Sequence, residues 1–315
     1  MEIKMQPEIY AKAALSEDNI LTKENIGCDG IEIQLLDELV NKKLGSYHYA
    51  EEVFDLDKLL KHNIKAVHAP LLSHFGLSDV NIESLCDSED FMLLDQVCYI
   101  ANKAGEINNR QVIVIIHSES SHEIMKLIGD TWKRVLNSIG CLLFKYPRIE
   151  IAIENVTPLR ECSKGILHLA NNFYNDNITM AVELRKQLNT DRIGTVLDTC
   201  HAEISKRFYE SLLPNYYEVL PTIDFSMDSF FKNNKDIVKL FHFSNTVGDG
   251  CGTGKHGQPF SEDSYKTLVK YLDLYHKYNI IAPITLEVAE TDYLVSDGYK
   301  ESYRLVNKYY NTIIK

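Results

Sequence analysis

The chain has 315 residues, of which 45% are hydrophobic and 25% charged, a composition typical of globular proteins. Its formal net charge of -12 opposes non-specific binding to nucleic acid. It contains no apolar stretch near the roughly twenty residues that span a bilayer and no basic-then-apolar signal pattern at its start. The seven cysteines are never spaced as C-x-x-C, so we expect a cytoplasmic protein that has no disulfide framework and contacts no membrane.

Apolar runs with strand character alternate along the chain with segments of helical periodicity. A short helix is expected after the first strand, further helical patterns cover residues 49–62, 81–107, 122–143, 178–188, 228–234 and 261–278, and a final helix runs to the C-terminus. The predicted strands are Glu8–Leu15, Gly27–Leu36, Ile64–Leu72, Gln111–Ser118, Ile149–Asn155, Ile193–Asp198, Ile237–Asn245 and Ile284–Val288.

This alternation predicts an α/β fold in which residues 1–315 form a single (β/α)8 TIM barrel with parallel strands and outer helices. An open, doubly wound sheet is the main rival, but it rarely directs polar groups from many strands to one point. In a barrel the active site lies at the carboxyl ends of the strands. Polar residues recur in or at the ends of the predicted strands, at Glu32, His68, His117, Glu154, Asp198, His242 and Glu287.

The stretch R-I-G-T-V-L-D-T-C-H is the centre of this pattern, because a buried strand ends at Asp198 and His201 follows three residues later. Taken singly, a strand-end histidine is more often a satisfied polar residue, and a buried glutamate is often half of an ion pair. A larger group at one mouth needs cations to balance it. The predicted metal ligands are His68, His117, Glu154, Asp198, His201, His242, His256 and Glu287. Nitrogen and oxygen donors without thiolate indicate zinc, manganese, cobalt or a similar divalent ion.

The glycine-rich run G-D-G-C-G-T-G at residues 248–254 is not a phosphate-binding loop, because it lacks both the strand-to-helix context and the Gly-Lys-Ser/Thr ending. We interpret it as a mobile flap over the site. Closure of such a flap would bring Lys255 and His256 to the barrel mouth.

The chain resembles the xylose-isomerase-like superfamily of TIM barrels, which contains sugar and sugar-phosphate isomerases and epimerases together with the zinc-type apurinic/apyrimidinic endonucleases. The resemblance covers nearly the whole chain. It rests on G-C-D-G-I-E-I at 27–33, H-A-P at 68–70, I-I-H-S at 115–118, I-E-N at 153–155, L-D-T-C-H-A at 197–202, F-H-F-S-N at 241–245, K-H-G-Q-P at 255–259 and L-E at 286–287.

The epimerase branch implies one ion held by Glu154, Asp198, His242 and Glu287. It also implies that Glu154 and Glu287 act as proton acceptors and donors around a metal-stabilised enediolate, while His201 orients a substrate oxygen. We expect Glu32 and Lys255 to contact the substrate, a small sugar or sugar phosphate.

The endonuclease branch implies a site of up to three zinc ions, to which His68, His117, His201 and His256 contribute further ligands. That branch also expects an aspartate where this chain has Gly254, which puts the third ion in doubt. The histidine set favours an endonuclease acting on damaged DNA, whereas G-x-D-G-I-E-I and the acidic segment after the second strand favour an isomerase.

The sequence therefore predicts a sugar or sugar-phosphate isomerase or epimerase that uses one to three zinc, manganese or cobalt ions. The alternative is a zinc-dependent apurinic/apyrimidinic endonuclease, for which nucleic acid would be the partner. A non-catalytic sugar-binding barrel is disfavoured by the number of intact ligand residues. The sequence gives no indication of an oligomeric state.

Overall fold

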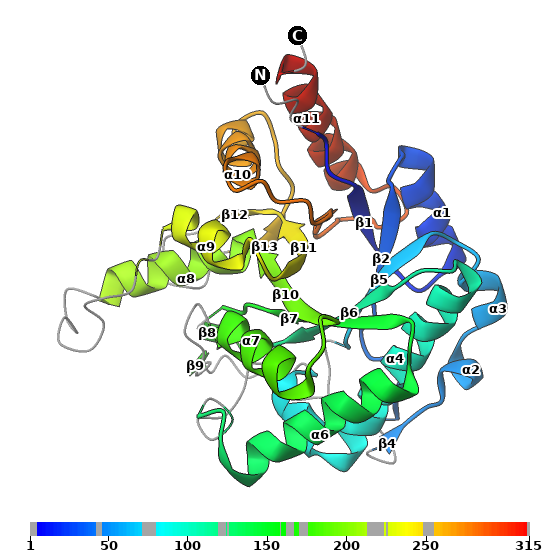
Figure 1. The fold of residues 1–315 in the computed structure, drawn as a ribbon. Coiled ribbons are helices and arrows are strands. Elements are labelled where there is room, and N and C mark those ends of the chain that lie inside the picture. Colours follow the sequence, from blue (N-terminus) through cyan, green and yellow to red (C-terminus); the bar gives the residue numbers. More distant parts are fainter. Residues whose placement is uncertain are drawn as a thin grey trace.

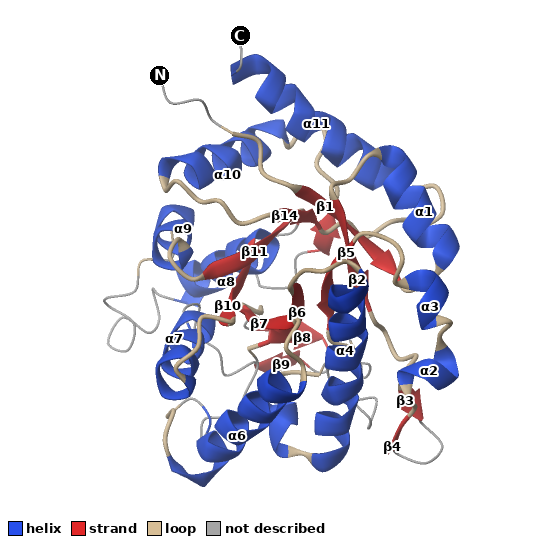
Figure 2. Cartoon of the chain, turned by 45° about the vertical axis from the view of Figure 1, so that its right-hand side comes forward, coloured by secondary structure: helices blue, strands red, loops and turns tan. Residues whose placement is uncertain are grey.

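Eight parallel strands close into a barrel in the order β1-β14-β11-β10-β7-β6-β5-β2, and helices surround it (Figures 1 and 2). The computed structural model describes residues 5–41, 46–70, 80–118, 124, 126–157, 159–161, 167–169, 176–212, 224, 226–247 and 255–313. The barrel strands are β1 (Ile9–Ala14), β2 (Gly30–Gln34), β5 (Ile64–His68), β6 (Val112–His117), β7 (Ile149–Glu154), β10 (Ile193–Asp198), β11 (Val238–Phe243) and β14 (Ile284–Leu286). The predicted TIM barrel is confirmed.

The strands have the near-continuous apolar sequences that parallel sheets require, because helices cover one face and the barrel interior buries the other. Every residue of β6 (VIVIIH) and of β10 (IGTVLD) is buried. The register then places the polar strand ends side by side. His117 is opposite Glu154 across β6 and β7, and Asp198 is opposite His242 across β10 and β11.

Along each barrel strand, every second side chain points into the barrel. These inward-pointing side chains form layers, an apolar layer followed by a polar layer at the mouth. The interior apolar cluster contains Tyr10, Ala66, Ile113, Ile115, Ala152, Val196 and Leu240. Two residues beyond six members of this cluster, in the direction of the strand C-termini, come the polar residues Lys12, His68, His117, Glu154, Asp198 and His242. The candidate site therefore rests on a packed apolar layer.

The outer helices are α1 (Glu17–Ile26), α2 (Ala50–Val53), α3 (Leu56–Leu59), the 3-10 helix η1 (Ile82–Cys86), α4 (Ser88–Ile107), α6 (Gly129–Lys145), α7 (Asp176–Leu188), α8 (Thr199–Leu212), α9 (Met227–Asn234), α10 (Tyr265–Lys277) and α11 (Asp297–Ile313). Three short antiparallel pairs lie outside the barrel sheet: β3 (Val40–Asn41) with β4 (Ser46–Tyr47), β8 (Leu159–Glu161) with β9 (Leu167–Leu169), and β12 (Asn245–Val247) with β13 (Lys255–Gln258). Within the described ranges, no helix has the length and apolar character needed to cross a membrane.

The predicted helices differ from the structure at several points. The segment 81–107 is divided at Asp87 into η1 and α4, and α6 begins only at Gly129, so residues 126–128 of the helix predicted over 122–143 are not helical.

The segment 49–62 is two short helices rather than one, because the side chain of Asp55 accepts a hydrogen bond from Lys58 N and starts a new helix, α3. The sequence analysis also placed no helix after Asp198, yet α8 begins at the next residue. Asp198 Oδ1 accepts a hydrogen bond from His201 N at 2.6 Å and so caps the helix without an intervening loop.

Candidate metal centre

Four side chains from four strands converge at the carboxyl-terminal mouth of the barrel. Glu154, Asp198, His242 and Glu287 each offer one ligand atom, and these atoms lie within 4.8 Å of one another. His242 Nδ1 lies 3.1 Å from Glu154 Oε1 and 2.7 Å from Glu287 Oε2. The same nitrogen is 3.9 Å from Asp198 Oδ2. We call this group the primary cluster.

The imidazole of His242 is held in place from below by Glu32. Its Nε2 lies 2.9 Å from Glu32 Oε2, and the hydroxyl of Thr285 donates to the same oxygen at 2.7 Å. A carboxylate behind a histidine fixes its tautomer and raises its basicity as a ligand. The contact with Glu32 therefore leaves Nδ1 as the nitrogen that faces the primary cluster.

The carboxylates around His242 show that this site attracts a positive charge. Burial by itself would lower the pKa of His242, but the carboxylates of Glu32, Glu154 and Glu287 raise it well above the ordinary value. The site thus favours a positive charge strongly enough to hold a proton on a fully buried imidazole. A divalent ion bound here would replace that proton.

Unpartnered carboxylate oxygens provide a test of whether these residues fit a metal ion. Among the described residues, Asp198 Oδ2 has no hydrogen-bond partner although Asp198 is completely buried. Glu287 Oε2 also lacks an aligned hydrogen bond. Burying such oxygens is costly without a compensating cation. Three carboxylates and one imidazole form a donor set that suits zinc, manganese or cobalt, so the primary cluster fits a divalent ion.

A second cluster lies on the other side of Glu154. His68 Nε2 is 3.1 Å from Glu154 Oε2, and His117 Nε2 is 3.6 Å from the same oxygen. His68 Nδ1 lies 2.8 Å from the carbonyl oxygen of Ala69, which makes Nδ1 the donor and leaves Nε2 available as a ligand. Since Oε1 of Glu154 faces His242 and Oε2 faces the two histidines, this carboxylate can bridge two ions.

The charge state of Glu154 agrees with that position. Burial would raise the pKa of its carboxyl, but His242, His117 and His68 together hold the pKa well below the ordinary value. The group is therefore anionic and available to a cation.

The remaining predicted ligands lie beside Asp198. The rings of His201 and His256 stack with their centroids 4.6 Å apart and an interplanar angle of 21°. His201 Nδ1 lies 2.8 Å from the carbonyl oxygen of Asn155, and His256 Nε2 lies 3.7 Å from Asp198 Oδ2. The structure thus brings all eight predicted ligand residues to one mouth.

The predicted flap, residues 248–254, lies outside the described residues. His256, which follows it, belongs to β13, and β13 pairs with β12. Lys255 was predicted to contact the substrate, and its side chain is not among the described ones.

Lys12 is a site residue that the sequence analysis missed. Its Nζ lies 2.6 Å from Glu287 Oε1 and 3.4 Å from Glu32 Oε1. Burial would lower the pKa of Lys12, but Glu287 and Glu32 raise it above the ordinary value, so the ammonium stays charged. In the closed barrel Lys12 lies two residues after the inward-facing Tyr10 of β1, a direction that the sequence of β1 does not reveal.

Glu32 was predicted to contact the substrate. It is completely buried in the middle of β2, between Lys12, His242 and Thr285. This position makes Glu32 a support for His242 beneath the primary cluster.

Replacing Glu32 by Gln is expected to weaken binding of a divalent ion by about 10–100-fold, the usual effect of losing a carboxylate behind a ligating histidine. Competition with a chelating dye measures the affinity. The matched control is Glu290→Gln, since Glu290 is also buried but accepts hydrogen bonds from Gly298 N and Tyr299 N at the start of α11. Equal affinities in the two variants would contradict the role given to Glu32.

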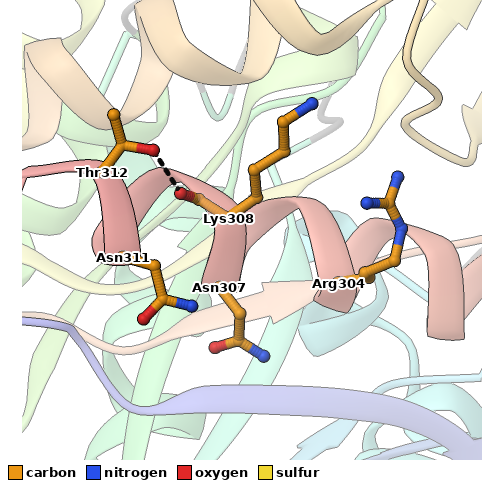
Figure 3. Close-up of a pocket in the computed structure, with 5 residues that line it drawn as sticks. All are labelled: Arg304, Asn307, Lys308, Asn311 and Thr312. Atoms are coloured by element: carbon orange, nitrogen blue, oxygen red, sulfur yellow. Dashed lines mark hydrogen bonds between the residues drawn. The ribbon is translucent and has the colours of Figure 1, made fainter.

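A surface pocket on α11 is not part of this site (Figure 3). It lies on an outer helix, where Thr312 Oγ1 donates to the carbonyl oxygen of Lys308. Both of its cations already contact Glu262. The lining residues are Arg304, Asn307, Lys308, Asn311 and Thr312.

Comparison with solved structures shows that the chain has the fold of the xylose-isomerase-like TIM-barrel enzymes, which confirms the resemblance seen in the sequence. Mannonate dehydratase from Streptococcus suis serotype 2 matches with a TM-score of 0.56 and 10% identity, covering 98% of this chain and 93% of that one. An L-ribulose 3-epimerase matches with a TM-score of 0.54 and 12% identity, covering 98% and 95%. D-allulose 3-epimerase from Methylomonas sp. matches with a TM-score of 0.53 and 14% identity, covering 100% and 99%.

No family model matches the sequence, and no curated protein matches it either. Because sequence identity to the solved structures is only 10–14%, the match shows the fold alone. The activity has to be argued from the site.

Proposed function

We propose that this protein is a divalent-metal-dependent isomerase or epimerase of a sugar or sugar phosphate. The observation that carries the proposal is the placement of two carboxylates, Glu154 and Glu287, around one ion site. They come from β7 and β14, with β10 and β11 between these strands in the barrel. Solved structures with this fold include two sugar 3-epimerases, which supports the same substrate class here.

In each of the two carboxylates one oxygen lies near His242, and they differ in the groups that contact the other oxygen. Glu154 turns Oε2 toward His68 and His117, whereas Glu287 turns Oε1 toward the ammonium of Lys12 at 2.6 Å. A bound ion in the primary cluster would stabilise the negative charge that develops on the substrate when a carbon next to a carbonyl loses its proton.

We assign proton transfer to the groups that an ion in the primary cluster would leave free. Glu154 Oε2 accepts the proton on one side, and the Lys12–Glu287 pair returns one on the other. One group acting alone gives isomerisation, and two groups acting on different faces give epimerisation.

Phosphodiester cleavage is the second candidate, and the cluster of His68, His117 and Glu154 favours it. If that cluster also holds an ion, both oxygens of Glu154 are occupied and neither can accept a proton. Paired ions that share a carboxylate are typical of phosphoester hydrolysis. Against a DNA substrate, residues 69–87 and 287–297, which follow β5 and β14, contain no lysine or arginine, and the net charge is -12.

The two candidates predict different chemistry on defined probes. A panel of ketoses, aldoses and their phosphates, incubated with the metal-loaded protein in deuterated water, should include one sugar that gains carbon-bound deuterium. Replacing Glu154 by Gln should lower the exchange rate by at least about 10²–10⁴-fold, the usual contribution of a general base, because the substitution removes a metal ligand as well as the base. Nuclear magnetic resonance follows both the label and the products, so sugar interconversion by hydride shift is also detected.

The same preparation should be tested on a duplex that contains an abasic site. Incision with neither labelling nor interconversion of any sugar would replace the isomerase proposal by the endonuclease. The ion lost on replacing His117 by Ala is an independent indicator, because an ion bound by His68 and His117 would occupy Glu154 Oε2.

A further inference from the structure

A buried thiol lies beside the primary cluster. Cys200 is the second residue of α8 and is completely buried. Asp198, Cys200 and His256 each offer one ligand atom, and these atoms lie within 4.8 Å of one another. We propose that these three residues, which we call the thiolate site, bind a further divalent cation of the thiophilic kind, such as zinc.

The carboxylate of Asp198 belongs to both the primary cluster and the thiolate site, and its free oxygen is available to both. Its Oδ1 is used by the His201 backbone N–H at 2.6 Å, while its Oδ2 has no hydrogen-bond partner among the described residues. Asp198 is 0% exposed, so water does not satisfy this oxygen. Oδ2 lies 3.7 Å from His256 Nε2, on the side of the thiolate site.

The spacing of the three ligand atoms is compatible with one ion. Zinc–sulfur and zinc–nitrogen bonds of about 2.3 and 2.1 Å place tetrahedral ligand atoms roughly 3.4–3.8 Å apart. Small side-chain rotations bring atoms that lie within 4.8 Å to that separation.

The environment of the thiol fits a ligand better than a nucleophile. Burial raises the pKa of Cys200, and the nearby Gly257 backbone and Thr246 hydroxyl lower it only in part. A protonated thiol is a poor nucleophile. A coordinating thiol loses its proton to the metal, so this environment does not prevent ligation.

The thiolate site connects two parts of the fold. Asp198 and Cys200 lie at the junction of β10 and α8, whereas His256 lies on β13, whose one strand partner among the described residues is β12. A cation held by all three residues ties the β12–β13 hairpin to the barrel next to the primary cluster. It also fixes His256 against the ring of His201.

The donor set gives this site a different metal preference from its neighbours. Sulfur ligands select zinc, cadmium and cobalt over magnesium, calcium and manganese. The primary cluster contains only oxygen and nitrogen donors. Manganese should therefore occupy the primary cluster and leave the thiolate site without an ion, whereas zinc or cobalt should occupy both.

Titration of the chelator-treated full chain with Co²⁺ tests this proposal, because cobalt bound to a thiolate absorbs strongly in the near ultraviolet and cobalt bound to oxygen and nitrogen alone does not. The wild type should show this band. Cys200→Ser should lose the band together with one bound ion per chain. The matched control is Cys98→Ala, since Cys98 is equally buried but lies in α4, and it should keep both.

A band that persists in Cys200→Ser, or a wild type without a band, would overturn the proposal. Cadmium-113 magnetic resonance of the wild type gives a second test that does not depend on any variant folding. A resonance shifted by sulfur ligation is expected, and its absence at saturating cadmium would count equally against the site. Neither measurement uses catalytic activity, so failure of the proposed isomerase function would leave this result interpretable.

Discussion

Replacing Glu154 by Gln is expected to abolish tight binding of divalent ions in both histidine–carboxylate clusters. Glu154 directs one oxygen to His242 and the other to His68 and His117, so a single substitution removes an anionic ligand from each. An ion present at 100 times its dissociation constant stabilises a protein by about 2.7 kcal/mol. Thermal denaturation with and without manganese, which has little affinity for the thiolate site, together with metal analysis, should show that this gain is largely lost.

Glu150→Gln is the matched control for that experiment. Glu150 lies on the same strand, β7, but pairs with Lys239 at 2.9 Å near the amino-terminal ends of β7 and β11, away from the mouth. This variant should keep the wild-type ion content and the wild-type gain in melting temperature. If Glu154→Gln binds manganese as tightly as the control, the primary cluster is not the metal site.

Replacing Lys12 by Met is expected to destabilise the metal-free protein by about 3–5 kcal/mol, the typical cost of removing one partner from a buried ion pair. The ammonium contacts both Glu287 and Glu32, and its side chain is only 11% exposed. Without the Lys12 ammonium, His242 is the nearest cation left beside the carboxylates of Glu32 and Glu287. Urea unfolding of the chelator-treated protein measures the loss.

Zinc should recover more stability in Lys12→Met than in the wild type, because the ion then replaces a missing positive charge. Lys145→Met provides the comparison. Lys145 pairs with Asp95 at 2.7 Å but is 57% exposed, so its loss should cost no more than about 1 kcal/mol. Equal losses in the two variants would show that Lys12 does not balance the charge of the site.

The barrel and the polar residues at its mouth could be predicted from sequence because each strand carries its own signal. A run such as V-I-V-I-I-H combines β-branched residues with one polar residue at the end, and barrel closure brings all such ends to one mouth. His117 and Glu154 could therefore be assigned to the same site although 36 residues separate them.

Lys12 could not be recognised in the same way. In I-Y-A-K-A-A a lysine can face the barrel interior or extend past the outer face, and the sequence of β1 alone does not fix which. Only the closed barrel shows that Lys12 follows Tyr10 on the inward side. Helix α8 was missed for a related reason, since its capping residue is also the last residue of a strand.

This double use of Asp198 limits which side chains can occupy the position. One oxygen caps α8, and the other belongs to the primary cluster. Asparagine, serine and threonine would preserve the cap but remove the anionic ligand, whereas glutamate would keep the charge but is not among the favoured capping residues. Aspartate alone meets both requirements. Metal preference at residue 198 therefore cannot be tuned by substitution without also altering where the helix begins.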